Sequence, residues 1–152
     1  MTKFLSLFAL VLSLTACEKA SPEPNAGPVI SDFDQEFSLN YQQQARLRTA
    51  NAPELAVTLA ELEYTYCPEN VFCFVGTFVA PSLNITDAQG QTQQLTLPLA
   101  GNLTNSAAFI DSASVLANSR RYVVYYTKWN IRNVKNYPEK QDISVQLRIV
   151  KP

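Results

Sequence analysis

Apolar residues at every second position constrain the fold of this chain more than any other feature of its sequence. The C-terminal segment "DISVQLRIV" alternates apolar and polar residues from Ile143 to Ile149. Successive side chains of a β-strand point to opposite faces, so this period predicts a strand with one buried face. The same period recurs in residues 37–41 and 55–59, whereas no segment has the period of a convincing amphipathic helix.

About seven short strands separated by polar turns predict an all-β fold, which we expect to be an antiparallel β-sandwich, with a barrel as the alternative. The parity of the apolar residues switches between Leu59 and Leu62, which predicts a β-bulge near Ala60. The segment Val71–Val79 is largely apolar, so we expect a central strand buried on both faces. Residues 105–119 are rich in Asn, Ser and Ala and predict a loop with one or two helical turns at most.

The N-terminus has the features of an export signal. Lys3 precedes an apolar run, Phe4–Leu14, that is too short to cross a bilayer of about 30 Å but suits a signal-peptide core. The run ends in "LTAC", which resembles the bacterial lipobox and implies cleavage before Cys17 and acylation of that residue. Several acyl chains form a stable membrane anchor. The alternative is an ordinary secretory signal followed by a chance cysteine.

Three regions follow from this pattern. Residues 1–16 are predicted to be the signal peptide, residues 17–32 a lipidated cysteine with a flexible Pro- and Gly-bearing tether, and residues 33–152 the β-sandwich. Glu18, rather than Asp, follows the lipid cysteine, which favours the outer membrane. We therefore expect a lipid-anchored protein of the bacterial cell envelope, with the membrane as a partner through its anchor.

Composition limits the chemistry. The chain is 47% hydrophobic, carries a formal net charge of -1 and contains no histidine. Nucleic acid is therefore not an expected partner, and the usual general base, zinc ligand and Ser-His or Cys-His pairs are excluded. We expect no cofactor and no metal site.

Charge is divided along the chain. Residues 17–119 carry 3 basic and 11 acidic residues, whereas residues 120–152 carry 8 and 2. One explanation is a basic face that binds an acidic partner. The explanation that we favour is neutralisation between early and late strands, because sandwich topology interleaves them.

Cys67 and Cys73 enclose the segment "PENVF". In an exported chain whose third cysteine is acylated, this pair predicts a structural disulfide. Thioredoxin-type centres have two residues between their cysteines, structural zinc needs four ligands, and a thiol nucleophile would lack an imidazole partner. A labile or regulatory disulfide remains the main alternative.

The same segment carries a resemblance to known proteins. Cys67-Pro68, four further residues, Cys73, an apolar pair and Gly76 resemble the pattern of a group of small uncharacterised bacterial lipoproteins and secreted proteins. The resemblance implies a disulfide-stapled β-sandwich and no particular activity.

One aromatic segment is a candidate partner-binding surface. In "SRRYVVYYTKW" a continuous strand period would place Tyr125 and Trp129 on one face, flanked by Arg120 and Arg121. Such a platform could stack on a saccharide or bind an envelope protein. The alternative is ordinary cross-strand packing of aromatic residues.

Two sets of carboxylates are candidate sites. Asp32, Asp34 and Glu36 have period 2 and could contribute to a calcium site, although a solvated strand start explains them as well. Glu61 and Glu63 share one face of a strand, and this spacing would admit paired-carboxylate hydrolysis. The alternative is that both are surface residues that form ion pairs.

These observations predict a non-catalytic binding or structural module of the cell envelope. The alternatives are a small carboxylate-based hydrolase, and a protein inhibitor that presents the Cys67–Cys73 loop to an enzyme cleft.

Overall fold

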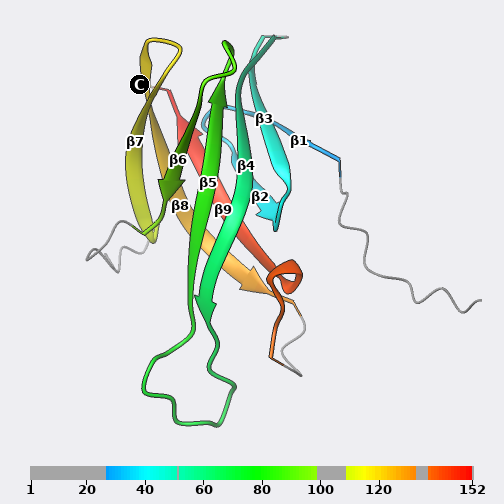
Figure 1. Cartoon of the computed structure of the whole chain (residues 1–152), viewed down its shortest axis with the longest axis vertical. Helices are drawn as coiled ribbons and strands as arrows, with labels where there is room; N and C mark the ends of the chain where they lie inside the picture. Colours follow the sequence, from blue (N-terminus) through cyan, green and yellow to red (C-terminus); the bar gives the residue numbers. More distant parts are fainter. Residues whose placement is uncertain (1–26, 51, 99–108, 133–136, 152) are drawn as a thin grey trace, which may run out of the picture.

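The computed structural model describes residues 27–50, 52–98, 109–132 and 137–151, which form two β-sheets packed face to face (Figure 1). The predicted all-β sandwich is confirmed. One sheet has the order β1-β3-β4-β5-β6 and the other has the order β2-β9-β8-β7. The described residues contain nine strands rather than about seven, and a short 3₁₀ turn, η1. Their bounds are β1 (Val29–Asp32), β2 (Glu36–Asn40), β3 (Gln44–Thr49), β4 (Ala52–Thr65), β5 (Phe78–Asp87), β6 (Thr92–Thr96), β7 (Asp111–Ala117), β8 (Arg120–Ile131), η1 (Lys140–Asp142) and β9 (Ile143–Val150).

The sandwich begins earlier than the sequence predicted. Val29–Asp32, which falls within the predicted tether, forms β1 and pairs in parallel with β3. Every other strand pair is antiparallel among the described residues. A strand of four residues is too short for its period to be recognised in the sequence, and Pro28 directly before it suggested a linker. The predicted tether therefore cannot extend beyond Pro28, because Val29 already belongs to β1.

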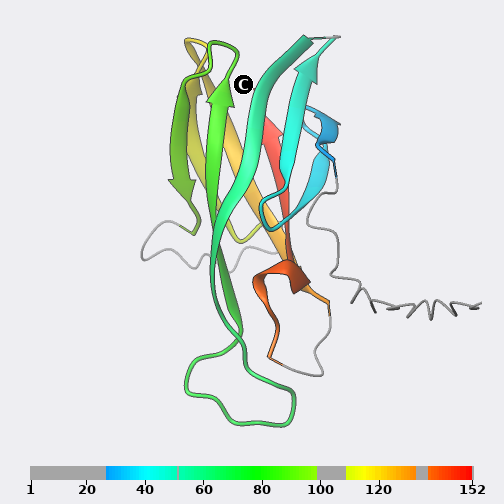
Figure 2. The same ribbon diagram turned by 45° about the vertical axis from the view of Figure 1, so that its right-hand side comes forward.

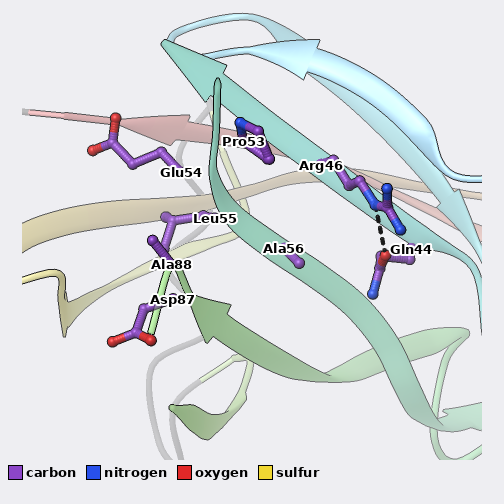
Figure 3. Close-up of a pocket in the computed structure, with 8 residues that line it drawn as sticks. All are labelled: Gln44, Arg46, Pro53, Glu54, Leu55, Ala56, Asp87 and Ala88. Atoms are coloured by element: carbon purple, nitrogen blue, oxygen red, sulfur yellow. Dashed lines mark hydrogen bonds between the residues drawn. The ribbon is translucent and has the colours of Figure 1, made fainter. Parts of the chain in front are cut away.

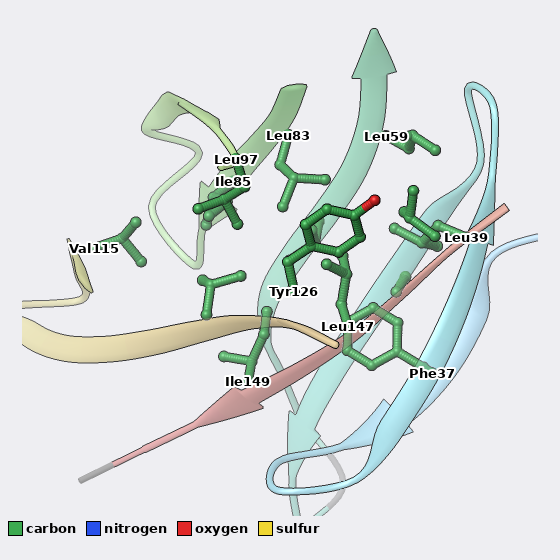
Figure 4. Close-up of a cluster of buried hydrophobic side chains, with 14 of the residues drawn as sticks. Phe37, Leu39, Leu59, Leu83, Ile85, Leu97, Val115, Tyr126, Leu147 and Ile149 are labelled. Atoms are coloured by element: carbon green, nitrogen blue, oxygen red, sulfur yellow. The ribbon is translucent and has the colours of Figure 1, made fainter. Parts of the chain in front are cut away.

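The core lies between the sheets and consists of the alternating apolar residues. The four alternating apolar residues of β9, Ile143, Val145, Leu147 and Ile149, are fully buried, as the period predicted. Figure 4 shows Leu147 and Ile149 in one buried cluster with Leu83 and Ile85 of the opposite sheet and with Tyr126. Tyr122 and Tyr126 of β8 are the largest fully buried side chains. Within the described residues, no helix has the length and apolar character that crossing a membrane requires.

The predicted bulge in β4 is confirmed. The pairing of β4 with β5 shifts register between Leu59 and Glu61, so Ala60 is the extra residue. Leu59 and Leu62 are consequently both buried although they have opposite parity. The bulge thus keeps one face of a long strand on the core.

The predicted strand Val71–Val79 is wrong over most of its length. β5 begins only at Phe78, and residues 66–77 form a loop. The reason is geometric: the Cα atoms of Cys67 and Cys73 lie 6.0 Å apart, whereas six extended residues span about 20 Å. The chain must therefore reverse before Cys73, and its apolar residues cannot continue a buried strand.

A second element was missed in residues 105–119. Asp111–Ala117 forms β7 at the edge of the second sheet, where a loop was expected. Its inward side chains are Ala113, Val115 and Ala117, which are buried. Small inward residues give a weak hydrophobic period, so this strand could not be recognised from its sequence. Residues 99–108 lie outside the described part of the chain.

Ion pairs connect the two oppositely charged halves of the sequence. Lys140 pairs with Glu61, Arg148 approaches Asp34 at 4.0 Å, and Lys151 lies 2.7 Å from Glu54. These are three of the four ion pairs found among the described residues, the fourth being internal to the early strands. This arrangement supports neutralisation between strands as the meaning of the divided charge.

Candidate partner-binding loop

Residues 66–77 form a loop that projects beyond the end of the sandwich (Figures 1 and 2). β4 and β5 remain paired as far as Thr65 and Phe78, and the chain between them leaves both sheets. The projection lies at the end opposite the β5–β6 hairpin, as Figure 1 shows. The long antiparallel pair therefore acts as a rigid stalk for the loop.

The predicted cysteine pair is placed for a disulfide. The Sγ atoms of Cys67 and Cys73 lie 2.12 Å apart. Between them the chain turns at Asn70, which adopts a positive φ of 65°, and the amide of Val71 donates to the carbonyl of Pro68 at 3.4 Å. Asn tolerates this left-handed conformation better than most residues, so the turn fits its sequence.

Hydrogen bonds hold the neck of the loop. The hydroxyl of Thr65 donates to the carbonyl of Gly76 at 2.7 Å, and the amide of Cys67 donates to the hydroxyl oxygen of Thr77 at 3.0 Å. Together with the cysteine pair, these bonds join the two sides of the loop at its base. The chain beyond the neck is consequently presented in a defined orientation.

The loop carries four exposed apolar side chains, which we call the apolar tip. Phe72 and Phe74 are 98% and 100% exposed, and Val71 and Val75 are both 56% exposed. Single exposed apolar residues are common on protein surfaces, but contiguous clusters mark interaction sites. Four such residues within five positions therefore make the tip the main candidate for a contact surface.

An apolar pocket of about 570 Å³ adjoins the tip, and we call it the Trp129 pocket. Its volume lies within the range of typical ligand sites. None of its described lining residues is charged, and its one side-chain hydroxyl, on Thr77, already bonds to Cys67. Uncharged apolar or aromatic groups are therefore the chemistry that this pocket suits. It is lined by Val75, Gly76, Thr77, Phe78, Val79, Ile110 and Trp129.

Trp129 reaches this pocket because β8 contains a bulge. The register of β8 against β9 shifts between Tyr126 and Lys128. Beyond the shift, Trp129 lies opposite the buried residue Val145, whereas Tyr125 lies opposite Arg148 on the outer face. Directly opposed residues of an antiparallel pair point to the same face. Trp129 therefore faces inward and Tyr125 faces outward.

The structure does not bring the four predicted partner-binding residues together. Arg120 and Arg121 are exposed at the start of β8, and Trp129 lies near its end. Tyr125 contacts the Arg148 guanidinium, whose carbon lies 4.9 Å from the ring centroid, rather than sharing a platform with Trp129. The expected single face is wrong because the strand period was assumed to continue through Thr127.

The candidate calcium carboxylates each have a protein partner. Asp32 accepts from Arg48 at 3.3 Å, Asp34 lies 4.0 Å from Arg148, and Glu36 accepts from the side-chain Nε2 of Gln146 at 3.1 Å. Within the described residues, no three His, Cys, Asp or Glu side chains gather as a metal site would require.

Glu61 and Glu63 lie on one outward face, as predicted, because Leu62 between them is buried. The hydrogen bond from Lys140 is the main cause that lowers the pKa of Glu61, with a further bond from the amide of Leu62. The same contact raises the pKa of Lys140. Glu61 is therefore held as a charged partner of Lys140, which is the ion-pair alternative.

A second pocket, of about 370 Å³, lies over the ends of β3, β4 and β5 (Figure 3). Its carboxylates are Glu54 and Asp87, and Figure 3 shows both pointing away from Arg46 and Gln44. Asp87 accepts from the amides of the hairpin turn at 2.9 and 2.8 Å, and Glu54 accepts from Lys151. Both carboxylates thus serve contacts within the fold.

Comparison with known proteins identifies no relative of this chain. No protein-family model, no curated protein and no solved structure matches this chain. The resemblance to small bacterial lipoproteins stays a prediction, and its lipidation site, Cys17, lies outside the described residues. The candidate site consequently depends on the apolar tip and the pocket beside it.

Removing the disulfide is expected to destabilise the chain modestly. Replacing Cys67 and Cys73 by serine together should lower the free energy of unfolding by about 2 kcal/mol, since a seven-residue closed loop restricts the unfolded chain by that amount. Urea denaturation measures the loss, and both proteins carry Cys17→Ser so that they differ only at the two loop cysteines. Two reactive thiols in the unfolded, unreduced protein would contradict the pairing.

Proposed function

We propose that this chain is a lipid-anchored, non-catalytic binding module of the bacterial cell envelope, with the apolar tip and the Trp129 pocket as its contact surface. The observation that carries the proposal is the near-complete exposure of Phe72 and Phe74 on a loop whose neck is closed by Cys67 and Cys73. Covering a phenylalanine is worth about 1.5–3 kcal/mol, and the sandwich itself covers neither ring. A binding partner gains that free energy instead.

The construction of the loop supports binding in a second way. Ordering a flexible segment on association costs free energy, and a segment that is already held in place avoids that cost. The hydrogen bonds of Thr65 and Cys67 at the neck are already present in the unbound chain. Exposed aromatic side chains on a stiff support are typical anchors of protein interfaces.

The predicted anchor supports a weak contact of small area. Two proteins held on one membrane meet at a high effective concentration, so a modest apolar interface is sufficient for association. A small tip without charged anchors is consistent with this setting.

The same loop supports one alternative, a protein inhibitor that inserts its tip into an enzyme cleft. A projecting stapled loop with two exposed aromatic rings has the shape that such an inhibitor needs. The two functions differ in their partner: an inhibitor captures an enzyme whose activity falls on binding.

Photo-cross-linking from the tip tests the proposal. A photoreactive phenylalanine analogue at Phe72 of the full chain, expressed in cells, is expected to capture a protein partner reproducibly. Leu116, which is 69% exposed on β7, is the matched control position for an exposed apolar residue outside the loop. Identical products from both positions, or no protein product from Phe72, would contradict the tip as a contact surface.

The anchor has its own test. Growth with labelled palmitate is expected to label the full chain, and Cys17→Ala should abolish the label together with membrane association. An unlabelled wild-type protein would refute the lipid anchor and leave the binding role of the loop to be judged by the cross-links.

A further inference from the structure

We infer that the partner of the apolar tip is a second copy of this chain, with Phe74 of each copy inserted in the Trp129 pocket of the other. This inference rests on the proposed function and names its partner. A fully exposed aromatic side chain and an apolar pocket lie at the same end of the molecule. Phe74 is directly followed by Val75, which already forms part of the pocket wall.

Symmetry makes this adjacency significant. Most homodimers have a twofold axis, so the same patch faces itself and must contain both the projecting group and its receptor. Here one short segment supplies both, since Phe74 projects while Val75, Gly76 and Thr77 line the pocket. An axis that passes close to Val75 would bring Phe74 of each copy to the mouth of the opposite pocket.

The pocket has the size and chemistry for a phenyl ring. A cavity of about 150 Å³ is enough to hold benzene, and the Trp129 pocket measures about 570 Å³. Trp129 and Phe78 offer ring surfaces for aromatic contact, which favours an aromatic occupant over an aliphatic one. The excess volume leaves room for part of the neighbouring backbone.

The distribution of charge also favours self-association. A residue close to a twofold axis meets its own copy, so a charged residue there would face a like charge. Glu69 is the one charged residue from Tyr64 through Thr86 in the sequence. The tip and the described pocket lining contain none. Recognition of a charged partner would instead call for a complementary charge at this surface.

The area available fits a small reversible dimer. Phe72 and Phe74 expose about 200 Å² each, so the four rings of two copies contribute about 800 Å². Val71, Val75 and the pocket walls bring the total close to about 1,200 Å², the lower limit of specific interfaces. Attachment of both copies to one membrane would compensate for this limited area.

The test uses two full-length copies with different affinity tags in the same cells. A photoreactive residue at Phe72 of one copy is expected to cross-link the other, giving a product that carries both tags. Phe74→Ala in both copies should reduce this product at least about tenfold, since a buried aromatic anchor contributes at least that factor. Leu116→Ala, a matched exposed apolar position on β7, should leave it unchanged.

A second variant fills the pocket instead of removing the inserted ring. A Cβ atom at Gly76 meets nothing within 4 Å, so Gly76→Leu is compatible with the isolated fold but places a side chain on the pocket wall. It should reduce the doubly tagged product as strongly as Phe74→Ala. At protein concentrations low enough for the wild type to be monomeric, thermal unfolding of both variants should match it, which shows that the loss is one of association.

Other results would overturn the inference. Capture of a different protein without any second copy would refute the dimer while the binding role of the tip remained supported. Cross-links to lipid alone, or no product, would refute the dimer and the proposed protein contact together. A doubly tagged product that persists in Gly76→Leu would show that the copies associate without the Trp129 pocket.

Discussion

Replacing Tyr126 by alanine is expected to lower the free energy of unfolding by about 4 kcal/mol, a large part of the stability of an ordinary domain. Tyr126 is fully buried in β8, and its hydroxyl donates to the carbonyl of Val79 on β5 at 3.0 Å. It therefore joins the two sheets by packing and by a hydrogen bond. The substitution leaves a cavity between the sheets and removes the hydrogen bond to the Val79 carbonyl, and chemical denaturation measures the combined cost.

Two matched variants separate these contributions. Tyr126→Phe retains the ring and removes only the bond to Val79, so we expect a loss of about 1 kcal/mol. Phe74→Ala removes an aromatic ring that is 100% exposed, and it should leave the free energy of unfolding nearly unchanged. If Tyr126→Ala were as mild as Tyr126→Phe, the packing of Tyr126 between the sheets would be refuted.

The contrast between these two aromatic residues shows where sequence reasoning succeeded. Tyr126 belongs to a run in which every second residue is buried, and Ile143–Ile149 on the neighbouring strand follows the same rule. Such periods reflect a local property, the alternation of side chains along an extended backbone. The core face of β9 and the bulge at Ala60 could therefore be predicted without any knowledge of tertiary contacts, whereas residues 122–126 are apolar at both parities and leave the core face of β8 open.

The apolar tip could not be found by the same rule, because apolar composition alone does not distinguish a buried strand from an exposed loop. Phe72 and Phe74 are as hydrophobic as core residues. What decides their position is the closure between Cys67 and Cys73, which prevents an extended chain. The predicted disulfide already implied this closure, so the error lay in extending a strand across a loop that the pairing forbids.

The Trp129 pocket depends on a second bulge, which the sequence pattern does not reveal. Apolar residues on the core side of β8 change parity between Tyr126 and Trp129, just as they do around Ala60 in β4. The hydroxyl of Thr127, at the shift, donates to the carbonyl of Gln146 at 3.1 Å. A continuous period fits the sequence equally well, because residues 122–126 are apolar at both parities, so only the register places Trp129 on the inner face. The β5 residues that pack beside Trp129 are tertiary contacts, which the period of a single strand does not predict.

Glu54→Gln is expected to lower the free energy of unfolding at neutral pH by about 2–3 kcal/mol and to remove much of the acid sensitivity of the fold. The carboxylate accepts from the hydroxyl of Tyr122, from Lys151 at 2.7 Å and from the hydroxyl of Thr49 at 2.6 Å. These contacts join both sheets to the end of β9. Its side chain is 18% exposed, so solvent screens the contacts only in part.

The pKa of Glu54 determines where acid should act. Burial by itself raises the pKa, but hydrogen bonds from Lys151, Thr49 and Tyr122 outweigh it and lower the pKa from 4.5 to about 2. In the unfolded chain the carboxyl regains its ordinary pKa, so below pH 4.5 the unfolded state takes up a proton that the folded state does not. The stabilisation is therefore complete above pH 4.5 and is lost as the pH falls towards 2.

Denaturation at a series of pH values between 2 and 7 measures this dependence. The wild type should lose stability steeply between pH 4.5 and 2, and Glu54→Gln should start lower and decline less, because glutamine has no carboxyl to protonate. Glu63→Gln, an exposed position on the same strand, is the control and should keep the wild-type slope. Equal slopes for Glu54→Gln and the wild type would mean that the contacts of Glu54 do not carry the acid sensitivity. In that case the contacts of Glu54 with Tyr122 and Lys151 would stabilise the fold by packing rather than through the charge of the carboxylate.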